Sequence, residues 1–277
     1  MKVGVLHPGS MGAALASNAR GDVYWASNGR SQATAARARD AGMVDLESLQ
    51  ELVERVDTII SVCPPGAAVE VAKDVSRLEF EGIYIDANAV SPTTSLEIAD
   101  MFARFVDGGI VGTPPHPPGT TASTKTRLYL SGEEAGIVVG IFAGSNIDPR
   151  VVGQAPGSAS ALKVAYAAWT KGSAALLLSL VAYARSQGVL ADLIHEWEGS
   201  IPHLPGRLES VASSIGRKAW RFEGEMEQIA AALADSDLPD GFHTSAAEVY
   251  ARLAELKDHA GPETIDEIVD LIVGSYS

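Results

Sequence analysis

The order of strand-like and helix-like segments is the feature that most restricts how this chain can fold. In the first half, short runs rich in β-branched and aromatic residues alternate with Ala-rich helical stretches. The expected strands are 2–6, 22–26, 58–63, 82–86, 105–107 and 127–131. Strands separated by helices of this length form right-handed βαβ units. We therefore expect an N-terminal α/β domain with a mainly parallel sheet.

The second half has a different pattern. Strand signals end at Gly153, and every later pattern is helical, beginning with about thirty residues from Ser158 to Gln187 without a proline. The chain is thus expected to divide into domains 1–154 and 155–277, the second all-helical. A helix this long exceeds an average surface helix and indicates an interface. Its Ala-Leu face around 174–180 predicts a homodimer.

Composition excludes several classes of partner. The formal net charge of −14 argues against nucleic acid or an anionic membrane, because the overall field would repel polyphosphates. The single Cys63 excludes an internal disulfide and a cysteine metal cage, and no metal site is expected. No charged leader precedes the first strand, and the longest apolar run, 174–183, is too short to span a bilayer. These features favour a cytoplasmic protein.

A glycine turn follows the first expected strand and opens the first helix. Gly9 and Gly12 occupy the second and third glycine positions of a dinucleotide fingerprint, whereas His7 stands where the first is expected. In that motif the pyrophosphate lies on backbone N–H groups at the helix start. We therefore expect a Rossmann-type domain whose contacts to the dinucleotide are Gly9, Ser10, Met11 and Gly12. His7 is expected to be a turn residue that faces the phosphates, and the alternative for the whole segment is a plain strand–turn–helix.

The end of the second expected strand bears on the choice of dinucleotide. NAD-preferring sites place an acidic side chain there to bind the ribose 2′-hydroxyl. This chain has no acid after Asp22 and offers Ser27, Arg30 and Ser31 instead, a set suited to a 2′-phosphate. NADP is therefore favoured over NAD. Alternatively, Ser31 only caps the helix that starts near Gln32.

Three segments together indicate a family. The turn 9–12 and the segments 57–65 and 86–92 resemble the β-hydroxyacid dehydrogenase and 6-phosphogluconate dehydrogenase superfamily. The resemblance implies that Cys63 and Pro64 lie along the cofactor and that Asn88 lies beside the nicotinamide. The alternative for Asn88 is a cap on the helix that begins near Thr93.

The resemblance continues into the helical half. Residues 157–163 look like the stretch that carries the catalytic lysine of the superfamily, which implies that Lys163 donates or accepts a proton. The amide expected one turn later is replaced by Tyr166-Ala167. Lys163, Tyr166 and Thr170 share a helix face, so Tyr166 is a catalytic candidate and Thr170 a substrate contact. The alternative is a solvated lysine, and Lys171 is expected at the surface.

Segments 166–172, 217–226 and 238–243 resemble a branch with a C-terminal helical domain of unassigned function, where Trp220 and His243 are pocket candidates. Two positions depart from the superfamily. Val111, before Gly112, replaces a substrate-binding serine, and Glu225 stands where hydroxyacid enzymes carry a Lys-Asp pair. An anion there disfavours a carboxylate substrate. The alternative is that Glu225 only solvates a helix surface.

The expected function is an NADP-dependent oxidoreductase. It would move a hydride between the nicotinamide and a small hydroxy or carbonyl compound, with Lys163 handling the proton. An imine reductase or amine oxidoreductase on the same scaffold is an alternative. A third possibility, from another class, is an NADP-binding protein without catalysis.

Overall fold

The computed structural model describes residues 1–120, 124–215, 218–258 and 264–274. The chain divides into two compact units, a sheet unit, Met1–Val164, and a helical unit, Ala165–Ser277. This division falls ten residues after the one expected at 154/155, because the first turns of the helix that begins at Ser158 pack against the sheet.

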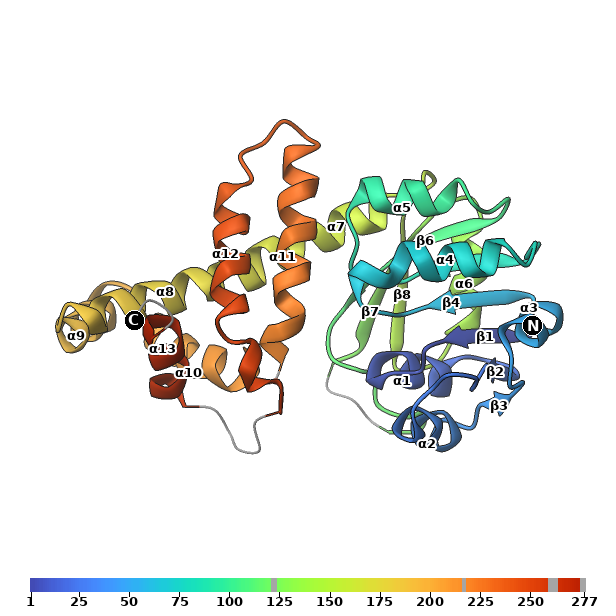
Figure 1. Cartoon of the computed structure of the whole chain (residues 1–277), viewed down its shortest axis with the longest axis horizontal. Helices are drawn as coiled ribbons and strands as arrows, with labels where there is room; N and C mark the ends of the chain where they lie inside the picture. The colour runs from blue at the N-terminus through green and yellow to red at the C-terminus, as the bar shows by residue number, and fades with distance from the viewer. Residues whose placement is uncertain (121–123, 216–217, 259–263, 275–277) are drawn as a thin grey trace. The chain divides into compact units, whose positions relative to one another are not determined.

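The sheet unit is built on eight strands in the order β3-β2-β1-β4-β5-β6-β7-β8 (Figure 1). They are β1 Val3–Leu6, β2 Val23–Trp25, β3 Val44–Asp45, β4 Thr58–Ser61, β5 Ile83–Asp86, β6 Phe105–Val111, β7 Thr126–Ser131 and β8 Ile147–Gly153. All neighbouring strands are parallel except β6 and β7. The mainly parallel α/β sheet is confirmed, with β3 and β8 added to the expected strands.

Helices cover both faces of this sheet. They are α1 Ser10–Asn18, α2 Gln32–Asp40, α3 Leu49–Arg55, α4 Ala68–Ser76 after a 3-10 turn Pro65–Ala67, α5 Pro92–Ala99 and α6 Ala135–Ile141. Buried residues of α1, α2 and α6 form one core with the sheet, and those of α3, α4 and α5 form another. Strands β1, β4 and β5 are buried along their whole length, as strands covered on both faces should be.

One unbroken helix runs from Ser158 to Ser186 and confirms the expected long helix. It consists of α7 Ser158–Ala167, a π-turn Ala168–Gly172 and α8 Ser173–Ser186. It is the one helix in the described part of the chain that is long and apolar enough to cross a membrane, judged by length and composition alone. The apolar run 174–183, which looked too short to do so, is therefore part of a longer apolar helix.

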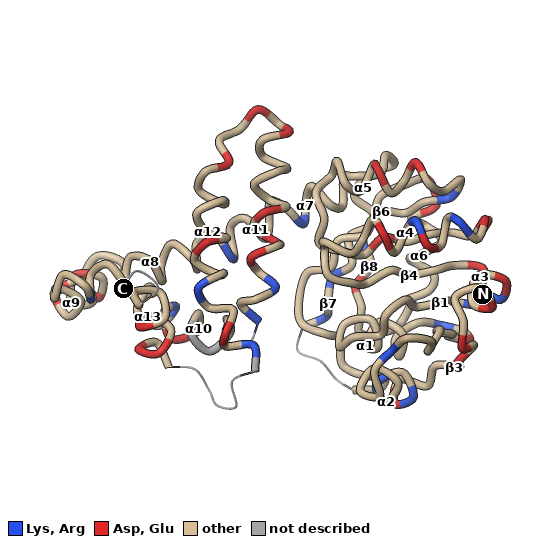
Figure 2. Tube along the Cα trace, viewed as in Figure 1, with Lys and Arg blue, Asp and Glu red and all other residues tan. Residues whose placement is uncertain are grey.

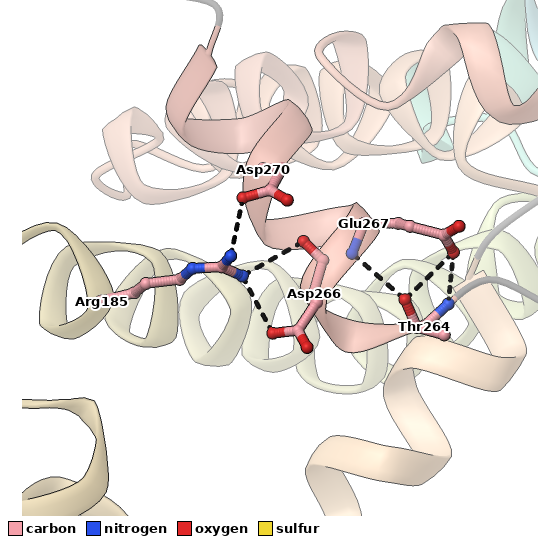
Figure 3. A network of polar contacts seen from close by, with 5 residues as sticks. All are labelled: Arg185, Thr264, Asp266, Glu267 and Asp270. Carbon is pink, nitrogen blue, oxygen red and sulfur yellow. Dashed lines mark hydrogen bonds and ion pairs between the residues drawn. The ribbon is translucent and has the colours of Figure 1, made fainter.

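The helical unit continues with α9 Leu190–Ser200, α10 Leu204–Ile215, α11 Ala219–Ala234, α12 Gly241–Ala251, a 3-10 turn Ala254–Asp258 and α13 Ile265–Gly274. Arg185 ties α8 to α13 by donating to Asp266 Oδ1 at 2.9 Å and by pairing with Asp270 at 3.0 Å (Figure 3). Thr264 and Glu267 exchange hydrogen bonds in a capping box that starts α13.

Candidate active site

The turn between β1 and α1 has the geometry of a phosphate-binding turn. Gly9 is the N-cap of α1 and brings no side-chain cap, so the first amides of the helix remain open to a ligand. A Cβ on Gly12 would lie 3.4 Å from the His7 carbonyl oxygen and 3.5 Å from Val5 Cγ1, so α1 starts close against β1. Open amides at a helix start bind phosphate well, and this turn therefore fits a dinucleotide pyrophosphate.

His7 occupies the first-glycine position in a left-handed conformation, with φ of 56°. Its carbonyl oxygen accepts a hydrogen bond from the Gly9 N–H at 2.6 Å, which closes the turn. Burial, and after it the charge of Arg30, lowers the pKa of the imidazole to about 4, while the charge of Asp74 opposes the shift. His7 is therefore a neutral turn residue at pH 7.

The loop after β2 presents the residues expected near a 2′-phosphate. Arg30 is exposed, and Ser31 caps α2 by accepting the Thr34 N–H at 3.2 Å. Sequence reasoning missed Arg37, whose Nε donates to the Pro8 carbonyl at 3.2 Å and so brings a cation of α2 against the phosphate turn. Basic residues gather around α2 in a chain that is otherwise acidic (Figure 2). No sequence signal separates Arg37 from the other arginines of that helix.

Asn88 connects the carboxyl ends of β4 and β5. Its Oδ1 accepts the Cys63 N–H at 2.5 Å, and its Nδ2 donates to Ser61 Oγ at 3.2 Å and to Asp86 Oδ1. The capping alternative for Asn88 is wrong, because the Ser91 hydroxyl caps α5 by accepting the Thr94 N–H at 3.1 Å. Asn88 instead fixes the Cys63–Pro64 segment that was expected to lie along the cofactor.

The pKa values of Asp86 and Cys63 are both raised. Burial raises the pKa of Asp86 to about 7; the charge of Asp107 adds to this shift and the Asn88 hydrogen bond opposes it. Among the described residues, no group bonds to Asp86 Oδ2. Burial also raises the pKa of the Cys63 thiol to about 12, so at neutral pH this residue offers its backbone and a neutral thiol.

Asp107 clamps the first turn of α7 to the sheet. This buried carboxylate accepts Ser131 Oγ at 2.9 Å, and it accepts the N–H and the hydroxyl of Ser160 at 2.9 and 2.6 Å. The Ser131 hydroxyl in turn accepts the Ala159 N–H at 3.0 Å. Side chains of β6 and β7 thus satisfy two open amides of the helix, which fixes where α7 begins.

Lys163 lies over Gly109 of β6. A Cβ on Gly109 would stand 2.8 Å from the Ala159 carbonyl oxygen and 3.1 Å from Lys163 Cβ, so only glycine lets α7 approach this closely. Asp86 pairs in register with Asp107 on β6, so the two side chains leave the sheet on the same face. Asn88 donates to Asp86, and Asp107 binds the start of α7, so Asn88 and Lys163 lie on this same face near the carboxyl ends of the parallel strands.

Val111, the last residue of β6, is the remaining substrate-binding candidate of the sheet unit. Val111 is 1% exposed and presents only methyl groups, and Gly112 follows with φ of 127°. Val111 thus supplies no polar contact in place of the serine that the resemblance led us to expect.

In the helical unit, Glu225 forms a largely buried ion pair with Lys171, whose Nζ also lies 4.4 Å from the centre of the Phe222 ring. The expectations of a surface Lys171 and a merely solvating Glu225 are both wrong. Because Lys171 neutralises Glu225, the charge argument against a carboxylate substrate loses its basis.

The π-turn explains the position of His243. A π-turn shifts the helical hydrogen bonds by one residue and changes which carbonyls find partners. His243 Nε2 lies 3.4 Å from the Ala168 carbonyl oxygen, and Tyr250 Oη donates to the Lys171 carbonyl at 2.8 Å. His243 is 9% exposed, so its observed contact is with this backbone.

The other candidates of the helical unit are more open. Tyr166 is 45% exposed, and Thr170 donates to the Tyr166 carbonyl from inside the π-turn, which rotates it away from ideal α-helical spacing. The Lys257 ammonium lies over the Trp220 ring, 4.3 Å from its centre. Residue 217 of the branch segment lies outside the described residues.

Comparisons with known proteins agree with this geometry. Residues 2–90 match the family model described as NADP oxidoreductase coenzyme F420-dependent, and residues 184–253 match a domain of unknown function, DUF1932. A protein of Methanothermus fervidus, described as an uncharacterized 28.5 kDa protein, is 29% identical over 206 residues, 72% of this chain and 78% of that protein.

Solved structures share the fold of the whole chain. A conserved protein reported as similar to 3-hydroxyacid dehydrogenases is 26% identical, with a TM-score of 0.68 and coverage of 93% of this chain and 98% of that one. The 3-hydroxyisobutyrate dehydrogenase of Mycobacterium tuberculosis is 17% identical, with a TM-score of 0.67 and coverage of 100% and 99%. A reductive aminase of Aspergillus terreus is 19% identical, with a TM-score of 0.52 and coverage of 97% and 98%.

The matched segments confirm the expected Rossmann-type domain and the helical C-terminal region. Residues 2–90 are thus similar to NADP-oxidoreductase cofactor domains and residues 184–253 to DUF1932, and the chain shares its fold with 3-hydroxyacid dehydrogenases and imine reductases.

Proposed function

We propose that this protein is an NADP-dependent oxidoreductase acting on a small hydroxy or carbonyl compound, with Lys163 as the proton donor and acceptor. One observation carries the proposal. Lys163 stands over Gly109 on the same face of the sheet as Asn88, at the edge formed by the carboxyl ends of the parallel strands. Dinucleotides bind along that edge in doubly wound sheets.

In this proposal each residue of the site has a separate role in the reaction. When bound, the nicotinamide supplies or takes the hydride. Lys163 protonates the carbonyl oxygen during reduction and removes the hydroxyl proton during oxidation. Asn88, with its amide held by three hydrogen bonds, keeps the Cys63 backbone in place along the cofactor. Asp107 and Gly109 set the position of the helix that carries Lys163.

The preference for NADP rests on Arg30, Ser27 and Ser31 at the end of β2, supported by Arg37 beside the phosphate turn. An arginine offers a 2′-phosphate two parallel charge-assisted hydrogen bonds, which a 2′-hydroxyl cannot match. No carboxylate stands among residues 23–31 to select NAD.

An imine substrate is the second candidate. It is favoured by the likeness to a reductive aminase and to an imine reductase from Bacillus cereus, and by the apolar Val111 at the end of β6. Reduction of an imine also requires a proton donor, so Lys163 keeps its role in this reaction.

The test is a panel of hydroxyacids, aldehydes and cyclic imines followed by NADPH absorbance, with NADH alongside. We expect Lys163→Met to lower kcat by at least about 100-fold while the Kd for NADPH stays within about twofold, since general acid–base groups contribute factors of this size. Conversion of imines but not hydroxyacids would establish the second candidate. Equal use of NADH contradicts the 2′-phosphate site, and full activity of Lys163→Met contradicts the proposed mechanism.

We also propose that the protein is a homodimer that works in the reducing cytoplasm on a small-molecule substrate. An exposed apolar face of α8 supports the dimer: Leu176, Leu180 and Tyr183 are 44%, 43% and 67% exposed. These residues follow one another at helical spacing and so form one continuous stripe.

A further inference from the structure

Arg127 is the second residue of β7 and has a buried donor without a partner. Its Nε is inaccessible to solvent and forms no hydrogen bond to any described group. No ion pair joins its guanidinium to a described carboxylate, although arginines 104 and 150 of the same unit both have acidic partners. A buried charged donor without an acceptor is destabilising, and its retention requires an explanation.

The strand register places Arg127 beside the proposed catalytic residues. β7 is antiparallel to β6, so its first residues lie at the edge where the parallel strands have their carboxyl ends. Arg127 pairs with Val111, and Tyr129 pairs with Gly109, the residue over which Lys163 stands. Arg127 is therefore two residues, about 7 Å, along the strand from the level of Lys163.

Side-chain alternation places Arg127 on the same face as Lys163. Leu128 and Leu130 pack into the core formed with α1, α2 and α6. Ser131 points to the opposite face, where it binds Asp107 and the start of α7. Because Arg127 alternates with Leu128 as Ser131 does with Leu130, its side chain leaves the sheet on the side of α7 and Asn88.

The neighbours of Arg127 leave its charge available. Val111, directly opposite, supplies only methyl groups. Asp148 is its register partner on β8, but the Asp148 carboxylate is bound by Arg150 at 2.6 Å. The Arg127 guanidinium has unused donors, lies next to the apolar Val111 and is near the proposed proton donor. Such a group can bind a small anion through two of its oxygen atoms.

We propose that Arg127 is a specificity-determining residue that binds an anionic group of the substrate while Lys163 transfers the proton at the reacting oxygen; the second half of this statement rests on the function proposed above. The anion is a carboxylate or a phosphate-type group, since both accept paired hydrogen bonds from arginine. Val111 shapes the apolar side of the same subsite.

Binding of small anions to the full chain saturated with NADPH tests the site without turnover. The probes are malonate and methylphosphonate, with malonamide as the neutral match of malonate, followed by calorimetry. We expect one or both anions to bind at millimolar concentration and malonamide to bind far more weakly. Arg127→Gln should weaken anion binding by about 10- to 100-fold, the range for a lost charge-assisted pair, and Arg127→Lys should recover part of it. The anion that binds more tightly shows whether the site prefers a carboxylate or a phosphate-type group.

Arg104→Gln is the matched control, because it removes an arginine of the same unit that pairs with Glu134 at the surface. It should leave anion binding unchanged. Arg127→Gln should melt no lower than the wild type without an anion, since it removes a buried donor that has no partner. Equal anion binding by wild type and Arg127→Gln overturns the proposal, and so does the absence of anion binding by the wild type.

Turnover separates this inference from the proposed reaction. With a hydroxyacid substrate, Arg127→Gln should raise KM by about 10- to 100-fold with a smaller change in kcat, while Lys163→Met removes kcat. If Lys163→Met stays active but malonate binding still depends on Arg127, the reaction mechanism fails and the anion site stands. If Lys163→Met is inactive and KM does not depend on Arg127, the anion site fails.

Discussion

At the scale of single residues, two neighbouring buried carboxyl groups differ in the number of hydrogen-bond donors they bind. Asp107 has three donors from Ser131 and Ser160. Asp86, its register partner, has the Asn88 amide alone, and its Oδ2 has no partner among the described residues. Burial is the main cause that raises the pKa of Asp86 to about 7, and the single Asn88 hydrogen bond opposes this shift only in part.

This raised pKa predicts how stability depends on pH. An exposed aspartate has a pKa near 3.8, so between that value and about 7 the folded chain holds a proton that the unfolded chain has released. The contribution of Asp86 to the free energy of unfolding therefore falls as pH rises, by about 1.4 kcal/mol per pH unit, and levels off above pH 7. Asp86→Asn stays neutral, so its stability relative to the wild type should increase from pH 5 to pH 7 by a few kcal/mol.

Urea unfolding at several pH values measures this difference, with the exposed Asp100→Asn as the control that should parallel the wild type. Parallel curves for Asp86→Asn and the wild type would show that Asp86 titrates normally.

Local motifs made part of the site predictable. The glycine turn and the candidate Lys163 could be proposed from the sequence because each depends on residues adjacent in the chain. The pairing of Lys171 with Glu225 joins residues 54 positions apart, and nothing in either segment indicates its partner. The sequence indicates that Arg127 and Leu128 lie on opposite faces of β7, because polar and apolar residues alternate in Arg127-Leu128-Tyr129-Leu130. That Arg127 lies near the candidate site follows only from the pairing of β7 with β6, which the sequence does not show.

At the scale of secondary-structure elements, the strand–helix alternation was predictable because each long element has its own hydrophobic period. β3 was missed because it has two residues, both exposed, and so carries almost no periodic signal. The π-turn was missed because the shift from α to π bonding has no sequence signature. Its carbonyls are contacted by side chains of α12, which is far away in the chain.

The contact between α7 and β6 gives a prediction for Gly109. In Gly109→Ala the new methyl group would come 2.8 Å from the Ala159 carbonyl, so α7 must move and carry Lys163 with it. We expect a loss of about 1–3 kcal/mol in stability, typical of overpacking, and a kcat reduced by at least about tenfold with the Kd for NADPH unchanged. Thermal melting, calorimetry and turnover of the best substrate measure the three effects.

Gly136→Ala is the control for this change. Gly136 lies in α6, and a Cβ there meets nothing within 4 Å, so the variant should be as stable as the wild type or slightly more stable. A Gly109→Ala variant with the kcat of the wild type would show that the close approach of α7 does not position Lys163.

At the scale of the whole molecule, the long helix Ser158–Ser186 carries both the proposed proton donor and the proposed dimer surface. Its first turns carry Lys163 against the sheet unit, and its later turns carry exposed apolar residues of the helical unit. The apolar stripe of α8 also borders a cavity of about 390 Å³ between α8 and α12, lined in part by Leu176 and Phe242. An exposed stripe next to an apolar hollow is a surface that a second copy of the chain could bury.

This surface makes the dimer testable. Light scattering should find the wild type as a dimer at micromolar concentration, and Leu176→Glu combined with Leu180→Glu should yield a monomer, because each glutamate would be buried without a partner. Ile137→Glu places the same charge on an exposed apolar position of α6 in the sheet unit and should leave the dimer intact. The double variant should bind NADPH with the Kd of the wild type, since the phosphate turn belongs to the sheet unit. A monomeric wild type, or a double variant that stays dimeric, would remove α8 from the interface and require another explanation for its exposed leucines.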